Sequence, residues 1–330
     1  MFLSIIIPVY NVEPYIERCL LSVLNQADRK DVEVIMVDDN GRDHSMEIVR
    51  KVVEAHPNGD IVRIFGHEQN RGLSAARNTG LSEAKGTYVW FVDSDDRIQE
   101  NYLQHISAVL QEPELDICLI SVGNCREDQS IQRFSYPELA GKIIEGKSFI
   151  LKRKIQVCVP FSIYRRAFLN ENQLQFKNGI FHEDNEFTLR SYYLAKKVTY
   201  IDEMIYFYYQ NPTSITQAPN PKKSLDYIIV ADSLFEFSKY HVKKKYQPFF
   251  NNYISLTINE ALHYFYEIND RTEQKKWEKK LGENERLINV LLKSSIVKYK
   301  IEGLLFKMFK QYIAVYKLLQ LFNKRSYKKK

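Results

Sequence analysis

Three carboxylates stand within four residues at Asp93-Ser94-Asp95-Asp96, directly after the apolar run 88–92. Asp93 and Asp95 lie two residues apart, so in extended chain their side chains point to the same side. Paired carboxylates offer the oxygen ligands that a hard divalent cation prefers, and such a cation can neutralise a diphosphate leaving group. Asp96 could instead be the N-cap of a helix beginning near residue 98, but a cap requires only one acid. The segment therefore predicts a metal site.

Two further segments contain groups suited to a nucleotide. Asp39 follows the apolar run 34–37, and a carboxylate there can accept a hydrogen bond from a nucleobase or a ribose; a turn or a helix cap is the alternative. Arg71 and Arg77 lie around the start of an expected helix over 73–84, where they could pair with phosphate oxygens. The same arginines could equally pair with the surrounding aspartates as a structural network.

A candidate base stands in His182-Glu183-Asp184, ahead of an expected helix over 186–194. A base that deprotonates an acceptor hydroxyl must be a group held close to the reacting carbon, and Asp184 could be that group. Helix capping is the alternative role for these acids. His182 is either a third metal ligand or a surface residue.

The first 120 residues contain the elements that must position these groups. Apolar runs predict strands at 3–9, 32–37, 61–65 and 87–92, and helical spacing predicts helices at 14–26, 45–53 and 73–84. Such alternation predicts a parallel sheet covered on both faces. Ligands bind these sheets at the carboxyl ends of the strands. We therefore expect residues 8–11, 38–40 and 93–96 to meet at one edge.

The remainder of the chain has a different character. From about residue 115 to 209 the pattern loosens into short strands and helices, and beyond the turn-rich stretches near 211–221 it becomes wholly helical. We expect a catalytic domain over 1–220, with a nucleotide-binding half of about 1–115 and an acceptor-side half of about 116–220. Residues 221–330 form a basic helical region, with 23 Lys and Arg against 11 Asp and Glu.

Cysteine usage and the N-terminus bear on the compartment. Cys19, Cys118, Cys125 and Cys158 lack metal-ligand spacing and are interpreted as reduced thiols. The N-terminus lacks the features of a signal peptide, and no apolar stretch approaches the roughly 20 residues that span a bilayer. These features predict a cytoplasmic location.

Taken together and in order, these segments resemble the family 2 glycosyltransferases, which are inverting enzymes with a GT-A fold. The matching residues are 4–11, 37–39, 70–80, 91–96 and 183–184. Residues 208–216 resemble a stretch common in the capsule and exopolysaccharide branch of that family. The resemblance covers about residues 1–220. It implies an α/β fold with a GT-A-type, Rossmann-like, mostly parallel sheet flanked by helices, followed here by a helical C-terminal extension.

The resemblance also implies roles for individual residues. Asp95 would bind Mn²⁺ or Mg²⁺, with Asp93 beside it or on the ribose. Asp39 would read the base, most often uracil. Asp184 would be the general base of a single in-line displacement that inverts the anomeric carbon. The other positions that would bind the donor, with Arg77 near the diphosphate, are Pro8, Tyr10, Asn11, Arg71, Arg77 and Ser94.

The implied reaction moves one sugar from a nucleotide-diphosphate donor, a UDP-sugar, to a hydroxyl of a glycan or lipid-linked acceptor in surface polysaccharide or lipopolysaccharide biosynthesis. Two departures from the family pattern bear on it. Residues 40–42, Asn-Gly-Arg, replace the usual Gly-Ser, which alters that loop. The Gln-x-x-Arg-Trp motif of processive synthases is missing, so we expect one transfer per encounter.

Rival interpretations make different demands on the sequence. A sugar nucleotidylyltransferase should have a Gly-rich basic loop after the first strand, and a dinucleotide-dependent oxidoreductase should have Gly-x-Gly-x-x-Gly there; residues 8–11 match neither. No recognised nucleic-acid-binding module accompanies the basic residues, so no nucleic-acid partner is expected. A non-catalytic, glycosyltransferase-like subunit remains an alternative.

The last 38 residues carry 11 Lys and Arg against the single acid Glu302. On a helix, lysines cluster on one side and apolar residues form much of the rest. The lysines are Lys300, Lys307, Lys310, Lys317 and Lys324, and the apolar residues are Ile301, Leu305, Met308, Tyr312, Val315, Leu319 and Phe322. We expect residues 293–330 to attach peripherally to an anionic membrane surface on its cytoplasmic face. The alternative packs the apolar stripe onto the catalytic domain.

Overall fold

The structure is a computed structural model, and it describes residues 2–27, 31–126, 130–152, 157–210, 220–267, 270–309 and 312–318. It divides into two compact units. The first consists of residues 1–179 and 187–214, and the second of residues 180–186 and 215–330. Each unit is described by itself below.

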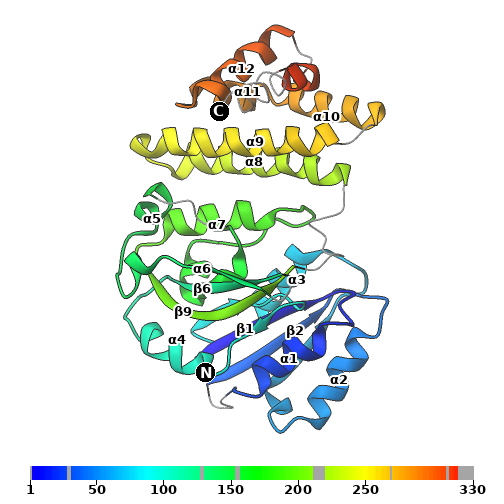
Figure 1. The fold of residues 1–330 in the computed structure, drawn as a ribbon, viewed down its shortest axis with the longest axis vertical. Coiled ribbons are helices and arrows are strands. Elements are labelled where there is room, and N and C mark those ends of the chain that lie inside the picture. The colour runs from blue at the N-terminus through cyan, green and yellow to red at the C-terminus, as the bar shows by residue number, and fades with distance from the viewer. Residues whose placement is uncertain are drawn as a thin grey trace. The chain divides into compact units, whose positions relative to one another are not determined.

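The first unit is built on a nine-stranded sheet (Figure 1). The strands are β1 (Leu3–Val9), β2 (Val32–Asp38), β3 (Val62–Gly66), β4 (Tyr88–Phe91), β5 (Arg97–Ile98), β6 (Ile117–Cys125), β7 (Ile131–Phe134), β8 (Ser162–Arg165) and β9 (Val198–Tyr209). Their order is β3-β2-β1-β4-β8-β6-β9-β5, and β7 pairs with β6. The strands β1 to β4 pair in parallel, whereas β8 runs antiparallel to both β4 and β6. The parallel prediction therefore holds for the first half, and the whole sheet is mixed.

Seven helices belong wholly or partly to the described residues of this unit. They are α1 (Ile16–Leu24), α2 (Ser45–Ala55), α3 (Leu73–Glu83), α4 (Tyr102–Leu110), α5 (Gly146–Lys152), α6 (Arg166–Glu171) and α7 (Glu183–Leu194). α1 and α2 lie on one face of the parallel strands and α3 on the other (Figure 1). The predicted helices and strands of the first 120 residues are thus confirmed, with ends that shift by up to two residues.

Two residues show how sequence and packing agree around β1. Gly80 lets α3 approach the sheet closely, because a Cβ there would lie 2.3 Å from Cγ2 of Ile6. Pro8 lacks the N–H that a central strand normally donates. Pairing of β1 with β4 ends at Ile6, however, so Pro8 has only β2 as its partner strand. A proline is therefore tolerated in a completely buried strand.

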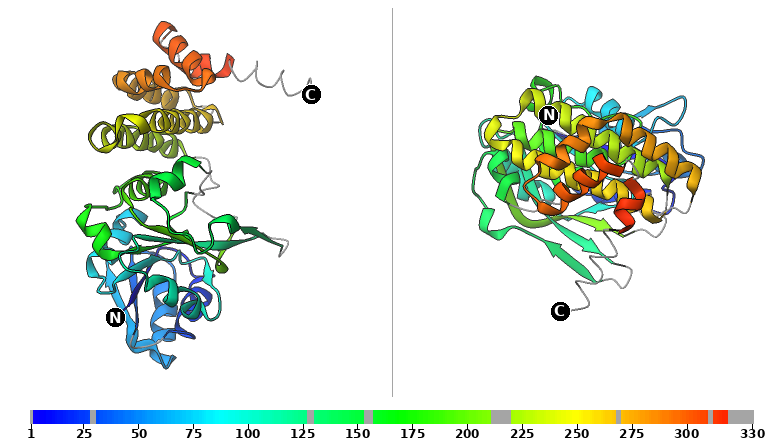
Figure 2. Two further views of the ribbon diagram at one scale, coloured as in Figure 1. Left: turned by 90° about the vertical axis from the view of Figure 1, so that its left-hand side faces the viewer. Right: turned by 90° about the horizontal axis from the view of Figure 1, so that it is seen from above.

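The second unit is helical in its described part, as predicted. Its helices are α8 (Pro221–His241), α9 (Gln247–Glu267), α10 (Arg271–Glu283), α11 (Glu285–Lys293) and α12 (Val297–Phe309), and residues 312–318 are also helical. α8 and α9 lie side by side, and α10 to α12 are on one side of that pair (Figures 1 and 2). No described helix is long and apolar enough to cross a membrane.

Candidate active site

The loops that follow β1, β2 and β4 meet at the carboxyl edge of the sheet, as predicted. Val9 pairs with Asp38 across the two parallel strands, and the Asp39 amide donates to the Val9 carbonyl at 2.9 Å. On the other side of β1, the Val92 amide donates to the Ile6 carbonyl at 2.9 Å. Residues 10–11, 39–41 and 93–96 therefore begin from neighbouring points on one edge.

The loop after β1 holds the altered loop after β2. Asn11 and Asn40 both have positive φ, 52° and 58°, a conformation that asparagine tolerates better than most residues. The Asn11 side-chain oxygen accepts a hydrogen bond from the Arg42 amide at 2.8 Å. The unusual Asn-Gly-Arg segment is therefore bound to Asn11. Tyr10 is 40% exposed beside it and presents a ring to solvent.

Asp39 is buried, and its carboxylate organises the loop that carries Arg71. One oxygen accepts from the Arg71 amide at 2.8 Å and contacts Nδ1 of His67 at 2.6 Å. The other accepts from the Gly72 amide at 2.8 Å and from the Asn70 side chain at 2.9 Å. A carboxylate has about four acceptor positions, so these contacts satisfy it. The Arg71 side chain itself is exposed at this edge.

His67 is a member of this network that the sequence analysis missed. Its Nε2 lies 2.9 Å from the Thr79 hydroxyl on α3, so the ring bridges Asp39 to that helix. His67 directly follows β3, so the strand-end rule that pointed to Asp39 also pointed here. Asp39 is thereby fixed from three elements. Its role in reading the base stays a prediction.

Replacing Asp39 with alanine should lower the free energy of unfolding by about 3 kcal/mol or more, because several buried donors would lose their acceptor at once. Asp38→Ala is the matched control. The Asp38 carboxylate accepts from the Asn40 amide at 2.9 Å in an exposed turn, so its loss should cost about 1 kcal/mol or less. Urea unfolding measures both. Equal losses would show that the Asp39 network does not stabilise the loop.

Arg77 pairs with Asp93 inside the protein. Its side chain is 1% exposed, and Nη2 lies 2.7 Å from Oδ1 of Asp93. The guanidinium also lies over the ring of Phe176, 5.4 Å from the centroid. Of the two alternatives for Arg77, the structure shows the ion pair with an aspartate. Contact between Arg77 and a diphosphate stays a prediction.

The alternative in which Asp96 caps a helix is wrong. Residues 97–98 form β5, which pairs with β9, and the next helix begins at Tyr102 with Asn101 in the N-cap position. Asp96 is completely buried and accepts from the Tyr206 hydroxyl at 2.6 Å and from the Tyr209 amide at 2.8 Å. Burial, and then the neighbouring charges of Asp95 and Asp93, raise the pKa of its carboxyl well above the usual value. Asp96 thus holds the end of β9 against the segment that follows β4 through these two hydrogen bonds.

Asp93 and Asp95 are more accessible than Asp96. The Asp93 side chain is 26% exposed, Asp95 is half-buried, and Ser94 between them is buried. The Arg18 guanidinium donates to the Asp95 carbonyl at 2.5 Å, which fixes the backbone of the segment. The described residues contain no cluster of three or more His, Cys, Asp or Glu arranged for a metal. Mg²⁺ and similar cations need only one or two carboxylates when substrate phosphates complete the shell, so this pair fits such an ion.

Asp184 lies in the first turn of α7, among residues that belong to the second unit. Aromatic rings surround this turn. The His182 ring stacks on Tyr227 at 3.8 Å between centroids and lies 5.8 Å from that of Tyr264. The Tyr253 hydroxyl donates to the Asn185 side chain at 3.1 Å. Aromatic side chains therefore pack around the turn that carries the candidate base.

The His182 side chain is half-buried, and its role as a third metal ligand stays a prediction. Its ring is stacked rather than free on the surface, and within the described ranges it belongs to no three-ligand cluster. Burial, with a smaller effect from Lys223, lowers the pKa of His182 to about 4, so the imidazole is neutral near pH 7. Farther along α7, Phe187 stacks on Phe176 at 4.0 Å and contacts Phe91 at the end of β4.

A parallel β3-β2-β1-β4 arrangement with carboxylates at the ends of β2 and β4 is typical of nucleotide-binding α/β enzymes. The sequence model of Glycosyl transferase family 2 matches residues 4–172. The uncharacterized glycosyltransferase EpsJ of Bacillus subtilis (strain 168) is 33% identical over 261 residues, which are 76% of this chain and 70% of EpsJ. The chain therefore belongs to glycosyltransferase family 2 and is a glycosyltransferase.

Other relatives are larger proteins. Glycosyltransferase GlyA of Streptococcus pneumoniae serotype 4 is 32% identical over 62% of this chain, but over only 30% of GlyA. The poly(ribitol-phosphate) beta-N-acetylglucosaminyltransferase TarS of Staphylococcus aureus (strain Mu50) is 31% identical over 63% of this chain and 35% of TarS. The chain thus spans about a third of these two relatives.

Solved structures confirm the predicted GT-A-type fold with its helical C-terminal region. The crystal structure of S. aureus TarS 1–349 in complex with UDP-GlcNAc has a TM-score of 0.72 at 23% identity, covering 97% of this chain and 92% of that one. A mannosyltransferase from Pyrobaculum calidifontis in complex with GDP-Man and Mn²⁺ has a TM-score of 0.55 at 15% identity, covering 98% and 87%. At these identities the likeness concerns the fold alone.

Proposed function

We propose that the protein moves a single sugar from a UDP-sugar to a hydroxyl of a glycan or lipid-linked acceptor in surface polysaccharide biosynthesis, on the cytoplasmic side of the membrane. The observation that carries this proposal is the meeting of Tyr10, Asp39 and the 93–96 acids at one sheet edge. The TarS relative, which was crystallised with UDP-GlcNAc and with UDP, supports a uridine donor.

Each residue at this edge has a role in the proposal. Tyr10, Asn11 and Arg71 contact the nucleotide, beside the buried Pro8 and Ser94, while Asp39 holds the Arg71 loop in place. Asp93 and Asp95 would hold a divalent cation, Mn²⁺ or Mg²⁺, which when bound would neutralise negative charge on the diphosphate leaving group.

Asp184 is the general base of the proposed reaction. It removes the proton from the acceptor hydroxyl as that oxygen bonds to the anomeric carbon of the donor. The bond from this carbon to the diphosphate breaks in the same step, so UDP leaves and the anomeric configuration inverts. In the proposal an acceptor sugar stacks on the half-buried rings of His182 and Tyr264.

Nucleotide release from a panel of UDP-, GDP- and dTDP-sugars, with and without Mn²⁺, tests the proposal. Slow hydrolysis of one UDP-sugar is expected even without the acceptor, and chelation of the metal should abolish it. Turnover of a GDP- or dTDP-sugar instead would contradict the donor assignment. Absence of turnover, together with absence of nucleotide binding by calorimetry, would favour the alternative of a non-catalytic partner subunit.

A further inference from the structure

The helix α12 has apolar side chains on two opposite sides. Tyr299 and Phe306 are buried within the second unit, and Gly303 lies against α11, where a Cβ would come within 2.9 Å of Leu291. This side packs the helix onto its neighbours. The side chains on the other side are exposed: Val297 by 68%, Ile301 by 44%, Leu304 by 54% and Met308 by 71%.

These four residues, which we call the α12 stripe, form one continuous line. At 100° per residue, positions 297, 301, 304 and 308 fall within an arc of roughly 60°. Positions 299 and 306 lie about opposite that arc. The α12 stripe is therefore the outward face of a packed helix. Exposed aliphatic side chains gathered in this way indicate an interaction surface.

The apolar face predicted from the sequence is only partly the exposed face of the structure. Ile301 and Met308 do lie on an exposed apolar face, and Leu305 is half-buried at its margin. Tyr312 and Val315, in contrast, are buried. Lys310, Leu319, Phe322 and Lys324 lie outside the described residues.

The exposed charged side chains on α12 are all lysines. Lys300 and Lys307 are exposed along one margin of it. Glu302 is the only acid in residues 286–330, and its side chain is completely buried. Its carboxylate accepts from the Asn259 amide group and lies 3.9 Å from Nζ of Lys298. The outward face of α12 therefore carries lysine and no carboxylate.

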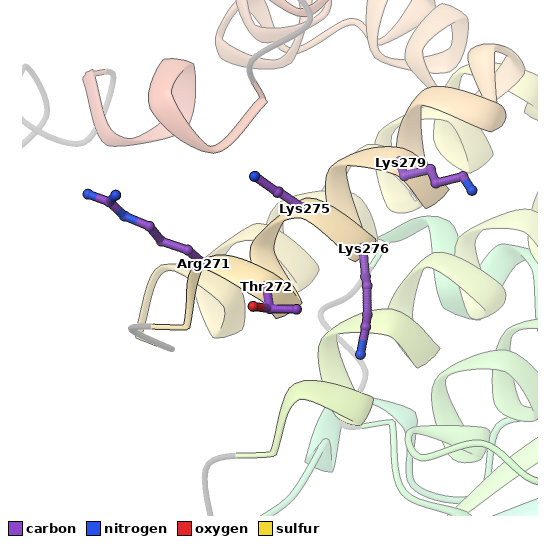
Figure 3. A pocket seen from close by; sticks show the side chains of 5 residues that line it. All are labelled: Arg271, Thr272, Lys275, Lys276 and Lys279. Atoms are coloured by element: carbon purple, nitrogen blue, oxygen red, sulfur yellow. The ribbon is translucent and has the colours of Figure 1, made fainter.

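A second basic feature of this unit lies on α10. Arg271, Thr272, Lys275, Lys276 and Lys279 line an open cavity of about 380 Å³ (Figure 3). Their side chains point in different directions, and Lys276 pairs with Glu273 at 2.6 Å. They do not converge on a ligand. Their contribution is positive charge on the same helical unit.

We propose that the α12 stripe docks on an anionic lipid bilayer, with its four aliphatic side chains in the interface and Lys300 and Lys307 among the headgroups. An apolar face flanked by lysines is typical of interfacial helices, and each lysine near an anionic surface adds to the attraction. A protein partner fits this face less well, because protein interfaces are depleted in lysine and rich in Tyr, Trp and Arg. The evidence for docking comes from the second unit and is independent of the chemistry proposed above. Docking would bring the protein to a lipid-bound acceptor.

Co-sedimentation of the full chain with vesicles tests the docking. Binding to vesicles that contain phosphatidylglycerol should exceed binding to pure phosphatidylcholine. The double variant Leu304→Glu/Met308→Glu should weaken it by at least about tenfold, because two buried apolar side chains are lost from the interface. Lys300→Glu/Lys307→Glu should remove the preference for the anionic vesicles. Leu256→Glu is the matched control, since Leu256 is an exposed leucine on α9, 42% accessible, and it should bind as the unmodified chain does.

Other outcomes would overturn the docking. One is unchanged vesicle binding by the Leu304→Glu/Met308→Glu variant when circular dichroism shows that it is folded. Another is self-association of the unmodified chain without lipid that this variant abolishes, which would make the α12 stripe an interface between two copies. Nucleotide release without vesicles should be equal in all variants. Loss of that activity in every sample, with vesicle binding intact, would contradict the proposed function alone.

Discussion

Asp184→Asn is expected to lower the rate of sugar transfer by about 10²–10⁴-fold, the usual contribution of a positioned general base. Asparagine preserves the shape of the side chain but cannot accept the proton of the acceptor hydroxyl. Binding of the nucleotide should change little, because the donor-binding residues lie on other segments. The loss should therefore appear in kcat for the acceptor reaction, with the affinity for UDP measured by calorimetry left nearly unchanged.

A second substitution in the same unit separates this effect from general loss of charge. Asp232 pairs with Arg286 at 2.6 Å on the surface of the helical unit, so Asp232→Asn makes the same chemical change on α8 instead of α7. It should leave the transfer rate within about twofold and alter stability by about 1 kcal/mol or less. If Asp184→Asn retained full transfer, another group would have to accept the proton.

The sequence predicted the parallel half of the fold well because its strands are buried on both faces. In β1 and β2 almost every residue is buried, so the apolar runs stand out. The same topology then determined which loops meet, since parallel strands end at the same edge. The positions of Tyr10, Asn11, Asp39 and Asp93 at this edge followed from the strand ends without any side-chain detail.

The second half of the sheet was harder to predict, because its elements depend on distant partners. β5 has two residues, and its pairing with β9 joins positions more than 100 residues apart. No local pattern distinguishes such a strand from the start of a helix, which is why a helix cap stood as an alternative for Asp96. The ion pair of Arg77 with Asp93 likewise depends on how closely α3 approaches β4, and spacing alone left it as one of two alternatives.

The C-terminal helices show a third kind of limit. Periodicity identified an amphipathic helix, but an apolar residue can face either the interior or the solvent. Val297 and Tyr299 are both apolar in character, yet the first is 68% exposed and the second 7%. Only the contacts of α12 with α11 decide between them. The exposed α12 stripe therefore became visible only in three dimensions.

Asp95→Asn and Asp96→Asn change adjacent residues but should affect different properties. The first should lower turnover, and the second should lower stability. Asp95 is half-buried, and its proposed role is to hold a cation. That cation stabilises the negative charge of the transition state by several kcal/mol. Substitution of Asp95 should reduce metal-dependent nucleotide release by about 10³-fold and leave the thermal unfolding midpoint nearly unchanged.

Asp96 is buried and accepts hydrogen bonds from Tyr206 and Tyr209, so its carboxyl contacts protein groups and not the nucleotide-sugar. Asp96→Asn keeps the shape but puts an amide N–H₂ against one of two donors, which should cost about 1–3 kcal/mol of stability. Turnover below the melting temperature should then stay within a few-fold, because the metal-binding pair is intact. The reverse result, with activity lost at Asp96 and kept at Asp95, would mean that the segment rearranges to bring Asp96 to the cation. Differential scanning fluorimetry beside the nucleotide-release assay distinguishes the two outcomes.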